Sequence, residues 1–322
     1  MSSLTQLTNG PDIAPAALVV VTCVRNEALR LPDFLAHHRR LGVSSFLIID
    51  NASDDGTTEF LTAQDDVRLY HTNQPYSESG CGIDWQNAVL ADAAVGHWTL
   101  ILDADELFIF PGYERTSLTE FVNWVSERRA DAVAAPMLDM YPNGPIANVG
   151  YQPGASLLET CPWFDSTGYS RQSIAPGLEV IHRGGPRKRL FWDGRRADFP
   201  SPVLHKIPLV RWQTRFSLTA STHALKGATL AKATGLLLHF KFLQDFANNA
   251  DSESRRAEHF MGARQYVAYR EVLAADTGLT AFHDGSVRFS DSRKLVELKL
   301  MSVPKGYPFV PAAVNTETNG VA

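Results

Sequence analysis

The sequence predicts an α/β fold in which a mostly parallel β-sheet is covered by helices on both faces. From about residue 16 to residue 140, short apolar runs alternate with amphipathic helical patterns, as in parallel sheets whose strands are joined by helices. The apolar runs are rich in β-branched residues, which favour buried strands. The 322 residues are 44% hydrophobic and 20% charged, a globular composition that excludes wholesale disorder.

Each element follows from a local pattern. We expect strands at five apolar runs of five or six residues: 17–22, 45–50, 67–71, 98–102 and 132–137. Helices are expected where apolar residues recur at helical spacing: 31–41, 83–94 and 117–129. From 141 to about 208, Gly, Pro, Arg and aromatic residues replace these patterns, which indicates functional loops or a lid. A strand at 235–239 and one or two helices within 245–273 follow.

The chain divides into an N-terminal tail, a sheet domain in two halves, a helical extension and a C-terminal tail: 1–15, 16–140, 141–243, 244–303 and 304–322. No run reaches the roughly 18 consecutive apolar residues of a membrane span. Three scattered cysteines provide no disulfide framework. With a net charge of −5, the chain is not expected to bind nucleic acid. We therefore expect a cytoplasmic protein with reduced thiols.

The strongest motif is the acidic sequence Asp103-Ala-Asp105-Glu106, directly after the apolar run 98–102. Residues two apart on extended backbone point to the same side, so Asp103 and Asp105 can converge on one ligand. Two such carboxylates repel each other unless a cation lies between them. Oxygen ligands of this kind suit Mg²⁺ or Mn²⁺ bound together with phosphate groups. The alternative is an acidic turn with helix-capping roles.

A second polar motif, Asp50-Asn-Ala-Ser-Asp-Asp-Gly-Thr57, follows the strand expected at 45–50. Its first carboxylate can accept hydrogen bonds from a base or a ribose, because ligands lie beyond the carboxyl ends of parallel strands. The alternative is a tight turn into a helix whose N-cap is Asp55 or Thr57. Both interpretations can hold together, with Asp50 functional and the rest of the turn structural.

Four motifs taken in order resemble glycosyltransferase family 2: TCVRNE at 22–27, DNASDDGT at 50–57, Asn87, and LDADE at 102–106. The stretch IIDNASDDGT is similar to a subgroup typified by bacterial polysaccharide and capsule transferases. The resemblance covers residues 16–140 and thins beyond Tyr141. It implies a GT-A fold and transfer of a sugar from a nucleotide diphosphate with inversion at the anomeric carbon. Residues 16–140 would then be the nucleotide-sugar half, and 141–243 the acceptor half.

The resemblance also implies roles for individual residues. It assigns nucleotide binding to Thr22, Cys23, Val24, Arg25, Asn26, Glu27, Asp50, Asn51, Asn87 and Ala104. Asp103 and Asp105 would hold Mn²⁺ or Mg²⁺ on the diphosphate. Many enzymes of this fold return a late histidine to the metal, which points to His239, with His223 as its rival. An imidazole ligand would favour Mn²⁺.

Several polar groups of the irregular region remain open to more than one interpretation. An inverting transfer needs a base, and the candidates are Asp165, Glu179 and Asp198, each of which could instead be a solvated carboxylate or an arginine partner. A basic cluster consists of Arg183, Arg187, Lys188 and Arg189. This cluster, with Lys241 further along the chain, could contact the diphosphate, an anionic acceptor or membrane lipid, or lie in solvent. Four aromatic residues could stack on sugar or fill the core: Trp163, Phe164, Tyr169 and Trp192.

These observations together predict a metal-dependent inverting glycosyltransferase. The resemblance implies that its donor is a nucleotide diphosphate sugar, with uridine expected from the family, and that its acceptor is a surface polysaccharide or lipid-linked saccharide at the inner membrane face. A haloacid-type phosphohydrolase is disfavoured because Glu106-Leu107 follows the acidic pair where that class has Thr or Val. A nucleotidyltransferase would carry glycines in the first loop, and a dehydrogenase a G-x-G-x-x-G motif. A non-catalytic protein that binds nucleotide sugars is the remaining alternative.

Overall fold

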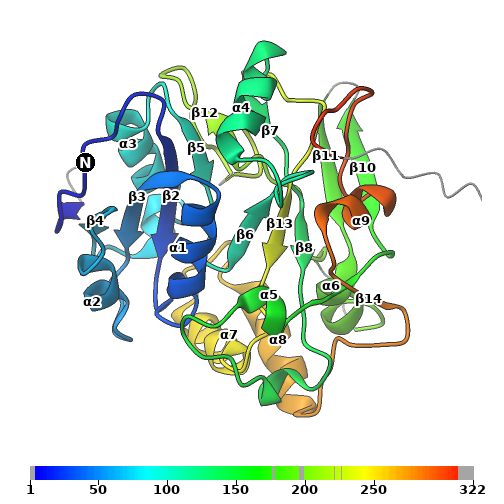
Figure 1. Ribbon diagram of the computed structural model, residues 1–322. Helices are drawn as coiled ribbons and strands as arrows, with labels where there is room; N and C mark the ends of the chain where they lie inside the picture. Colours follow the sequence, from blue (N-terminus) through cyan, green and yellow to red (C-terminus); the bar gives the residue numbers. More distant parts are fainter. Residues whose placement is uncertain (1–3, 176–177, 196–198, 221, 226, 311–322) are drawn as a thin grey trace, which may run out of the picture.

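The computed structural model describes residues 4–175, 178–195, 199–220, 222–225 and 227–310 (Figure 1). Its largest element is a seven-stranded sheet with the order β1-β4-β3-β2-β5-β12-β7. These strands are β1 (Thr5–Gln6), β4 (Val67–His71), β3 (Val43–Asp50), β2 (Leu18–Val24), β5 (Trp98–Ile101), β12 (Leu209–Arg211) and β7 (Ala132–Val133). The pairs β4–β3, β3–β2 and β2–β5 are parallel, whereas β1 and β12 pair antiparallel with their neighbours. The predicted α/β fold with a mostly parallel sheet is confirmed.

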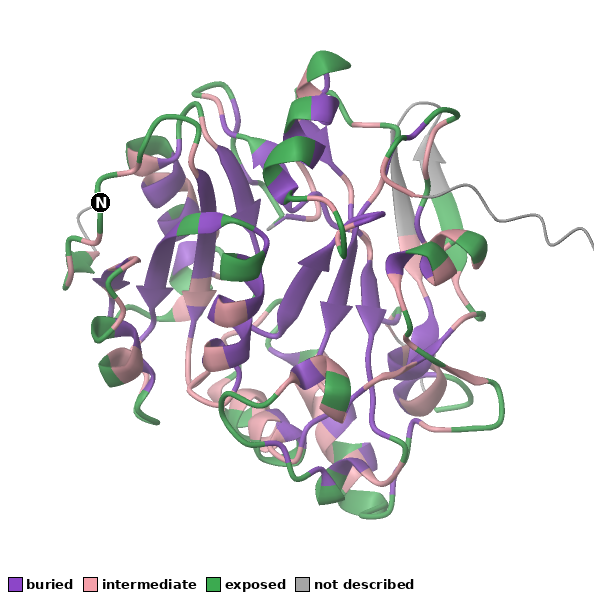
Figure 2. Cartoon of the chain, in the orientation of Figure 1, coloured by how far each residue is buried: buried purple, intermediate pink, exposed green. Residues whose placement is uncertain are grey.

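Helices cover both faces of this sheet. Successive side chains of a strand point to opposite faces, so each central strand packs against helices on both sides. The helices of the described chain are α1 (Leu31–Arg40), α2 (Thr57–Thr62), α3 (Ile83–Ala93), α4 (Leu118–Glu127), α5 (Leu157–Thr160), α6 (Gly185–Phe191), α7 (Phe246–Arg256), α8 (Arg264–Ala275) and α9 (Ser292–Glu297). On β2, Val20 packs in one apolar cluster with α1, α2 and α4. Its neighbours Val19 and Val21 pack with α3 in a second cluster. The central strands are therefore buried almost throughout (Figure 2).

A second sheet continues directly from the first. It consists of β6 (Glu106–Ile109), β13 (Leu236–His239) and β8 (Met137–Asp139), with β13 in the middle. Strand β13 runs antiparallel to β6 and parallel to β8. The turn between β5 and β6 joins the two sheets, so the acidic motif at 103–106 lies where they meet. Two ribbons complete the strands: β9 (Trp163–Asp165) with β14 (Ser286–Arg288), and β10 (Ser170–Ala175) with β11 (Leu178–Arg183).

One sequence prediction differs from the structure in this part of the chain, and the structure adds short elements to another. The run 132–137 is not one strand: β7 pairs in the first sheet and β8 in the second, with Pro136 between them. Proline cannot donate a ladder hydrogen bond, which suits this break. The stretch 141–208 carries five short elements that the sequence did not predict, α5, β9, β10, β11 and α6, although most of its described residues lie outside helices and strands. Their lengths of three to seven residues leave too little periodicity for recognition.

The helical extension packs against the end of the second sheet. Figure 1 shows α7 and α8 below the two sheets, and their apolar residues share a third cluster with Phe191 and Phe242. Parts of both predicted tails are structured: β1 pairs with β4, and Tyr307 is buried with its ring 4.9 Å from that of Trp124. The N-terminal tail is thus held by backbone pairing and the C-terminal tail by an aromatic contact. The domain boundary at 243 stays a prediction.

Candidate active site

Three acidic side chains gather in the turn between β5 and β6. Buried strand β5 ends at Ile101, and Glu106 opens β6. One carboxylate oxygen from each of Asp103, Asp105 and Glu106 lies within 4.8 Å of the other two. The side chain of Asp103 is 55% exposed and that of Asp105 is 13% exposed, whereas Glu106 is fully buried. Carboxylates this close repel one another, so this turn requires positive charge from elsewhere.

Two lysines supply part of that charge. Lys206, just before β12, donates from Nζ to Asp103 Oδ2 and to Glu106 Oε1, each at 2.6 Å. Lys241 Nζ lies 3.5 Å from Asp105 Oδ2. Burial alone would lower the pKa of Lys206, but Asp103 and Glu106 outweigh burial and raise that pKa. The Lys206 ammonium therefore stays charged at neutral pH.

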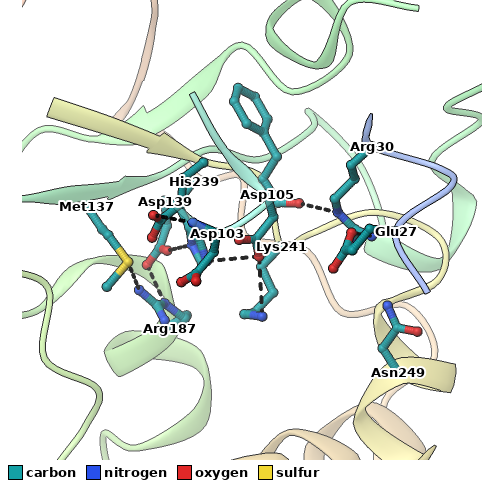
Figure 3. A network of polar contacts seen from close by, with 12 residues as sticks. Glu27, Arg30, Asp103, Asp105, Met137, Asp139, Arg187, His239, Lys241 and Asn249 are labelled. Atoms are coloured by element: carbon teal, nitrogen blue, oxygen red, sulfur yellow. Dashed lines mark hydrogen bonds and ion pairs between the residues drawn. The ribbon is translucent and has the colours of Figure 1, made fainter. Parts of the chain in front are cut away.

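His239 reaches the acidic turn from the end of β13 (Figure 3). The register of the second sheet places it opposite both Glu106 and Asp139. Its Nε2 lies 3.2 Å from Asp105 Oδ2, and its Nδ1 donates to Asp139 Oδ1 at 2.6 Å. Burial opposes a charged ring, but Asp105 outweighs it and the pKa of His239 is raised. A carboxylate behind the imidazole is the arrangement that orients metal-binding histidines.

Asp139 is a site residue that the sequence analysis missed. It is buried at the end of β8, and its Oδ2 accepts from Arg187 Nε at 2.9 Å. Burial raises the pKa of Asp139, but Arg187 and His239 outweigh burial and lower it. Arg187, expected near a diphosphate, is thus buried in α6 and paired with this carboxylate. An acidic residue directly after an apolar strand was the signal available in the sequence.

Hydrogen bonds from Arg25 and Asn26 hold the predicted nucleotide loop at 22–27 to the turn after β3, and we call this set of bonds the clasp. Arg25 Nη1 donates to the carbonyl oxygens of Asn51 and Ala52, at 2.5 and 2.9 Å. Asn26 has a positive φ of 56° and donates from Nδ2 to Asp54 Oδ1 at 2.8 Å. At the start of the loop, Thr22 Oγ1 is buried without a hydrogen-bond partner among the described residues. The clasp fixes the carboxyl ends of β2 and β3 relative to each other.

The acidic turn affects the pKa values of two residues in this loop, Cys23 and Glu27. Burial, followed by Asp103 and Asp50, raises the pKa of the Cys23 thiol. Burial likewise raises the pKa of Glu27 to about 7; Arg30 opposes this rise, and Asp105 adds to it. Arg30 Nη1 lies 3.3 Å from Glu27 Oε2 (Figure 3). The charges of this loop and of the acidic turn therefore influence one another.

Asp50 is fully buried at the end of β3. Its Oδ1 accepts from Ser53 Oγ at 2.5 Å and its Oδ2 from Thr58 Oγ1 at 2.6 Å. The next residue, Asn51, donates from Nδ2 to the carbonyl oxygens of Thr72 and Gln74, at 3.2 and 2.9 Å. Both side chains thus shape the turn, as the structural alternative expected. A direct role of either in nucleotide binding stays a prediction.

The helical extension also reaches these loops. Arg256, the last residue of α7, donates from Nη2 to Asn51 Oδ1 at 2.7 Å. Glu258 Oε2 accepts from the backbone N–H of Tyr76 at 2.6 Å. The segment between α7 and α8 therefore contacts the strand-end loops, a function of the extension that the sequence did not indicate.

Other predicted residues have different surroundings. Asn87 exchanges two hydrogen bonds with the backbone of Leu218, at 2.9 and 3.0 Å. Ala104 is buried between the two aspartates. His223 donates from Nδ1 to the carbonyl oxygen of His205 at 2.6 Å, and burial lowers its pKa to about 4. Of the two candidate ligands, His239 is the one in contact with the acidic pair.

The three candidate bases have different surroundings. Asp165 accepts from Tyr141 Oη at 2.6 Å and from Arg189 Nη2 at 3.1 Å, which makes it an arginine partner and engages Arg189 away from the acidic turn. Glu179 belongs to β11, but its side chain lies outside the described part of the structure. Asp198 lies outside the described residues altogether.

Of the aromatic residues considered for sugar stacking, Phe164 and Trp192 are buried in the core.

Comparisons with known proteins give a partial match. No model of a known protein family matches the chain. Glycosyltransferase family 92 protein Os08g0121900 from Oryza sativa subsp. japonica is 34% identical over 103 residues, which is 30% of this chain and 17% of the relative. The chain therefore matches about a sixth of that protein's length. The resemblance to a glycosyltransferase is supported by this segment, whereas membership of family 2 is not.

Two solved structures are distantly similar. A putative glucose-1-phosphate thymidylyltransferase from Bacillus anthracis, in complex with a sucrose, has 10% identity and a TM-score of 0.31, covering 80% of this chain and 84% of that chain. A 4-diphosphocytidyl-2C-methyl-D-erythritol synthase has 10% identity and a TM-score of 0.28, covering 88% of this chain and 99% of that chain. Within the described residues, none of the helices is long and apolar enough to cross a membrane.

Proposed function

We propose that this chain is a metal-dependent inverting glycosyltransferase that moves a sugar from a nucleotide diphosphate sugar, with UDP-sugars expected first, to an acceptor hydroxyl. The acceptor would be a saccharide or lipid-linked saccharide at the inner face of the membrane. The observation that carries the proposal is the meeting of Asp103, Asp105 and His239 at the carboxyl end of β5. The segment shared with a family 92 glycosyltransferase supports sugar transfer in particular.

The residues present fit a divalent cation. Asp103 and Asp105 offer oxygen ligands, and Asp139 holds the Nδ1 proton of His239 so that Nε2 faces Asp105. This mixed donor set favours Mn²⁺ over Mg²⁺. When bound, such a cation would stabilise charge on the departing diphosphate. Lys241, beside Asp105, would pair with a phosphate oxygen as a point charge.

We place the nucleoside over the ends of β2 and β3, since ligands of open α/β sheets lie beyond the carboxyl ends of the strands. The unpaired hydroxyl of Thr22 and the clasped loop at 22–27 would line this part of the site. Arg256 and the segment after α7 would cover it from the helical extension. Asp50 would contribute through the turn that it organises.

We propose Glu27 as a further candidate base. A general base works best when its pKa lies near the working pH, and burial raises the pKa of Glu27 to about 7. If Glu27 accepts the acceptor proton, Glu27→Gln loses turnover and keeps nucleotide affinity, and wild-type turnover rises with pH through about 7. If Glu27 only binds nucleotide, Glu27→Gln loses affinity instead.

Ligand binding and turnover together test the proposal. Thermal shifts with UDP, GDP, CDP and ADP, each with and without Mn²⁺, identify the base, because a ligand at roughly 100 times its Kd adds about 2.7 kcal/mol of stability. The matching nucleotide sugars are then assayed for release of the nucleotide diphosphate. Binding without turnover for any acceptor would favour a non-catalytic protein. Hydrolysis of a simple phosphate monoester, without nucleotide binding, would favour a phosphohydrolase.

A further inference from the structure

The acidic turn already has its own positive charges, and they affect how a metal ion could enter. Lys206 Nζ lies 2.6 Å from both Asp103 and Glu106, while His239 and Lys241 lie 3.2 and 3.5 Å from Asp105. We propose that Lys206 competes with the divalent cation for Asp103, so that metal alone binds weakly and the metal and the nucleotide diphosphate bind together. This inference rests on the proposed function.

Lys206 is fixed in place, whereas Asp103 is free to move. The side chain of Lys206 is 4% exposed, and its backbone carbonyl accepts from the N–H of Ala135 at 2.9 Å. Its second partner, Glu106, is fully buried and would be left as an unpaired charge if the lysine withdrew. The side chain of Asp103 is 55% exposed and can rotate towards a cation. The exchange therefore moves Asp103, and Lys206 stays with Glu106.

Charge explains why the two ligands should help each other. A divalent cation that takes Asp103 from Lys206 leaves an ammonium close to a second positive charge, which is unfavourable in a partly buried site. The phosphates of a nucleotide diphosphate are negative and can accept a hydrogen bond from the released ammonium. Each ligand thus removes the cost that the other creates. Coupling of this kind is reciprocal: UDP tightens Mn²⁺ binding by the factor by which Mn²⁺ tightens UDP binding.

Calorimetry on the full chain tests this competition. Mn²⁺ is titrated alone and in the presence of saturating UDP, into the wild type and into Lys206→Met. We expect UDP to tighten Mn²⁺ binding to the wild type by at least about tenfold, a coupling within the usual range. Lys206→Met should bind Mn²⁺ alone about tenfold more tightly or better, with a correspondingly smaller effect of UDP. Lys294→Met, which removes an exposed lysine of α9, is the control and should match the wild type.

A double variant covers the case in which Lys206→Met does not fold. Lys206→Met with Glu106→Gln removes one charge of each sign, so no buried glutamate is left unpaired. It should also bind Mn²⁺ alone more tightly than the wild type does. The inference is overturned if this folded double variant gains no Mn²⁺ affinity, or if UDP leaves Mn²⁺ binding to the wild type unchanged. If none of UDP, GDP, CDP and ADP binds under any condition, the proposed function is overturned instead, and the titrations of Mn²⁺ alone would still judge Lys206.

Discussion

Two turns at the carboxyl end of the main sheet are both acidic, but they are stabilised differently. In the turn after β3, Asp50 accepts from the hydroxyl groups of Ser53 and Thr58, three and eight residues away. In the turn after β5, Asp103 pairs with Lys206, which is 103 residues away in the sequence. The carboxylate of Asp50 thus accepts from nearby hydroxyl groups, whereas that of Asp103 pairs with a charged group from a distant part of the chain.

This difference separates a shaping role from a chemical one. Asp50 has both oxygens engaged within its own turn and is inaccessible to solvent, so it can position backbone without meeting a ligand. Asp103 is more than half exposed and pairs with one lysine, the contact that we propose a cation replaces. Charge that is balanced by exchangeable partners is available for binding, whereas charge satisfied within a tight turn is not.

The largest expected effect is loss of transfer at the second turn. Asp105→Asn should lower turnover by roughly a thousandfold or more, since stabilisation of the departing diphosphate by a cation contributes several kcal/mol. Asp103→Asn should act in the same direction. Initial rates at saturating Mn²⁺ measure this, with circular dichroism to confirm folding and Asp65→Asn, at an exposed residue between α2 and β4, as the matched control. Near-normal turnover in a folded variant would exclude that residue as a metal ligand.

The next effect concerns stability behind the second turn. Asp139→Asn leaves the buried guanidinium of Arg187 without its carboxylate, which should cost about 3–5 kcal/mol of unfolding free energy. Urea denaturation measures the loss. Asp139→Asn combined with Arg187→Met should recover most of it, because no buried charge then remains unpaired. A loss below about 1 kcal/mol in the single variant would show that the pair contributes little.

Among the described residues, His37 is buried without a carboxylate partner, in contrast to His239, and this difference predicts a dependence of stability on pH. His37 donates from Nε2 to the carbonyl oxygen of Phe108 without a carboxylate, and burial lowers its pKa to about 4. Since this folded pKa lies below the ordinary 6.5, stability should be complete above pH 6.5 and fall as pH drops towards 4, by up to about 3 kcal/mol.

Urea midpoints between pH 7.5 and pH 5 test this effect, with His37→Gln as the comparison. The variant should lose less stability than the wild type over the same interval. Equal losses in the two proteins would assign the acid sensitivity to other groups, such as His38, whose pKa burial lowers further.

The smallest expected effect is at the first turn. Asp50→Ala should weaken binding of the nucleotide diphosphate about tenfold, through distortion of the loop that it organises. The Mn²⁺ dependence of turnover should stay the same. Calorimetry with UDP decides, and an unchanged Kd would limit Asp50 to shaping the turn.

How much of the structure the sequence predicted depends on how far apart in the chain the interacting residues lie. The strands β2, β3, β4 and β5 and the polar residues at their ends were recognisable because each is written in one short run. The pairing of Lys206 and Asp139 with this site was not recognisable, because they become neighbours of the acidic turn only when β12 and β13 pair. Helix α6 was missed because its sequence GPRKRLF begins with Gly and Pro and buries Arg187.

The middle position of β13 also has a consequence for synthesis of the chain. Strands β6 and β8 pair only with β13 in their sheet, so both have open edges until residue 239 has left the ribosome. Most of their side chains are apolar and buried in the finished protein, among them Leu107, Ile109 and Leu138. Exposed strand edges with such side chains attract other chains. A nascent or truncated chain that stops before β13 should therefore aggregate or occupy chaperones.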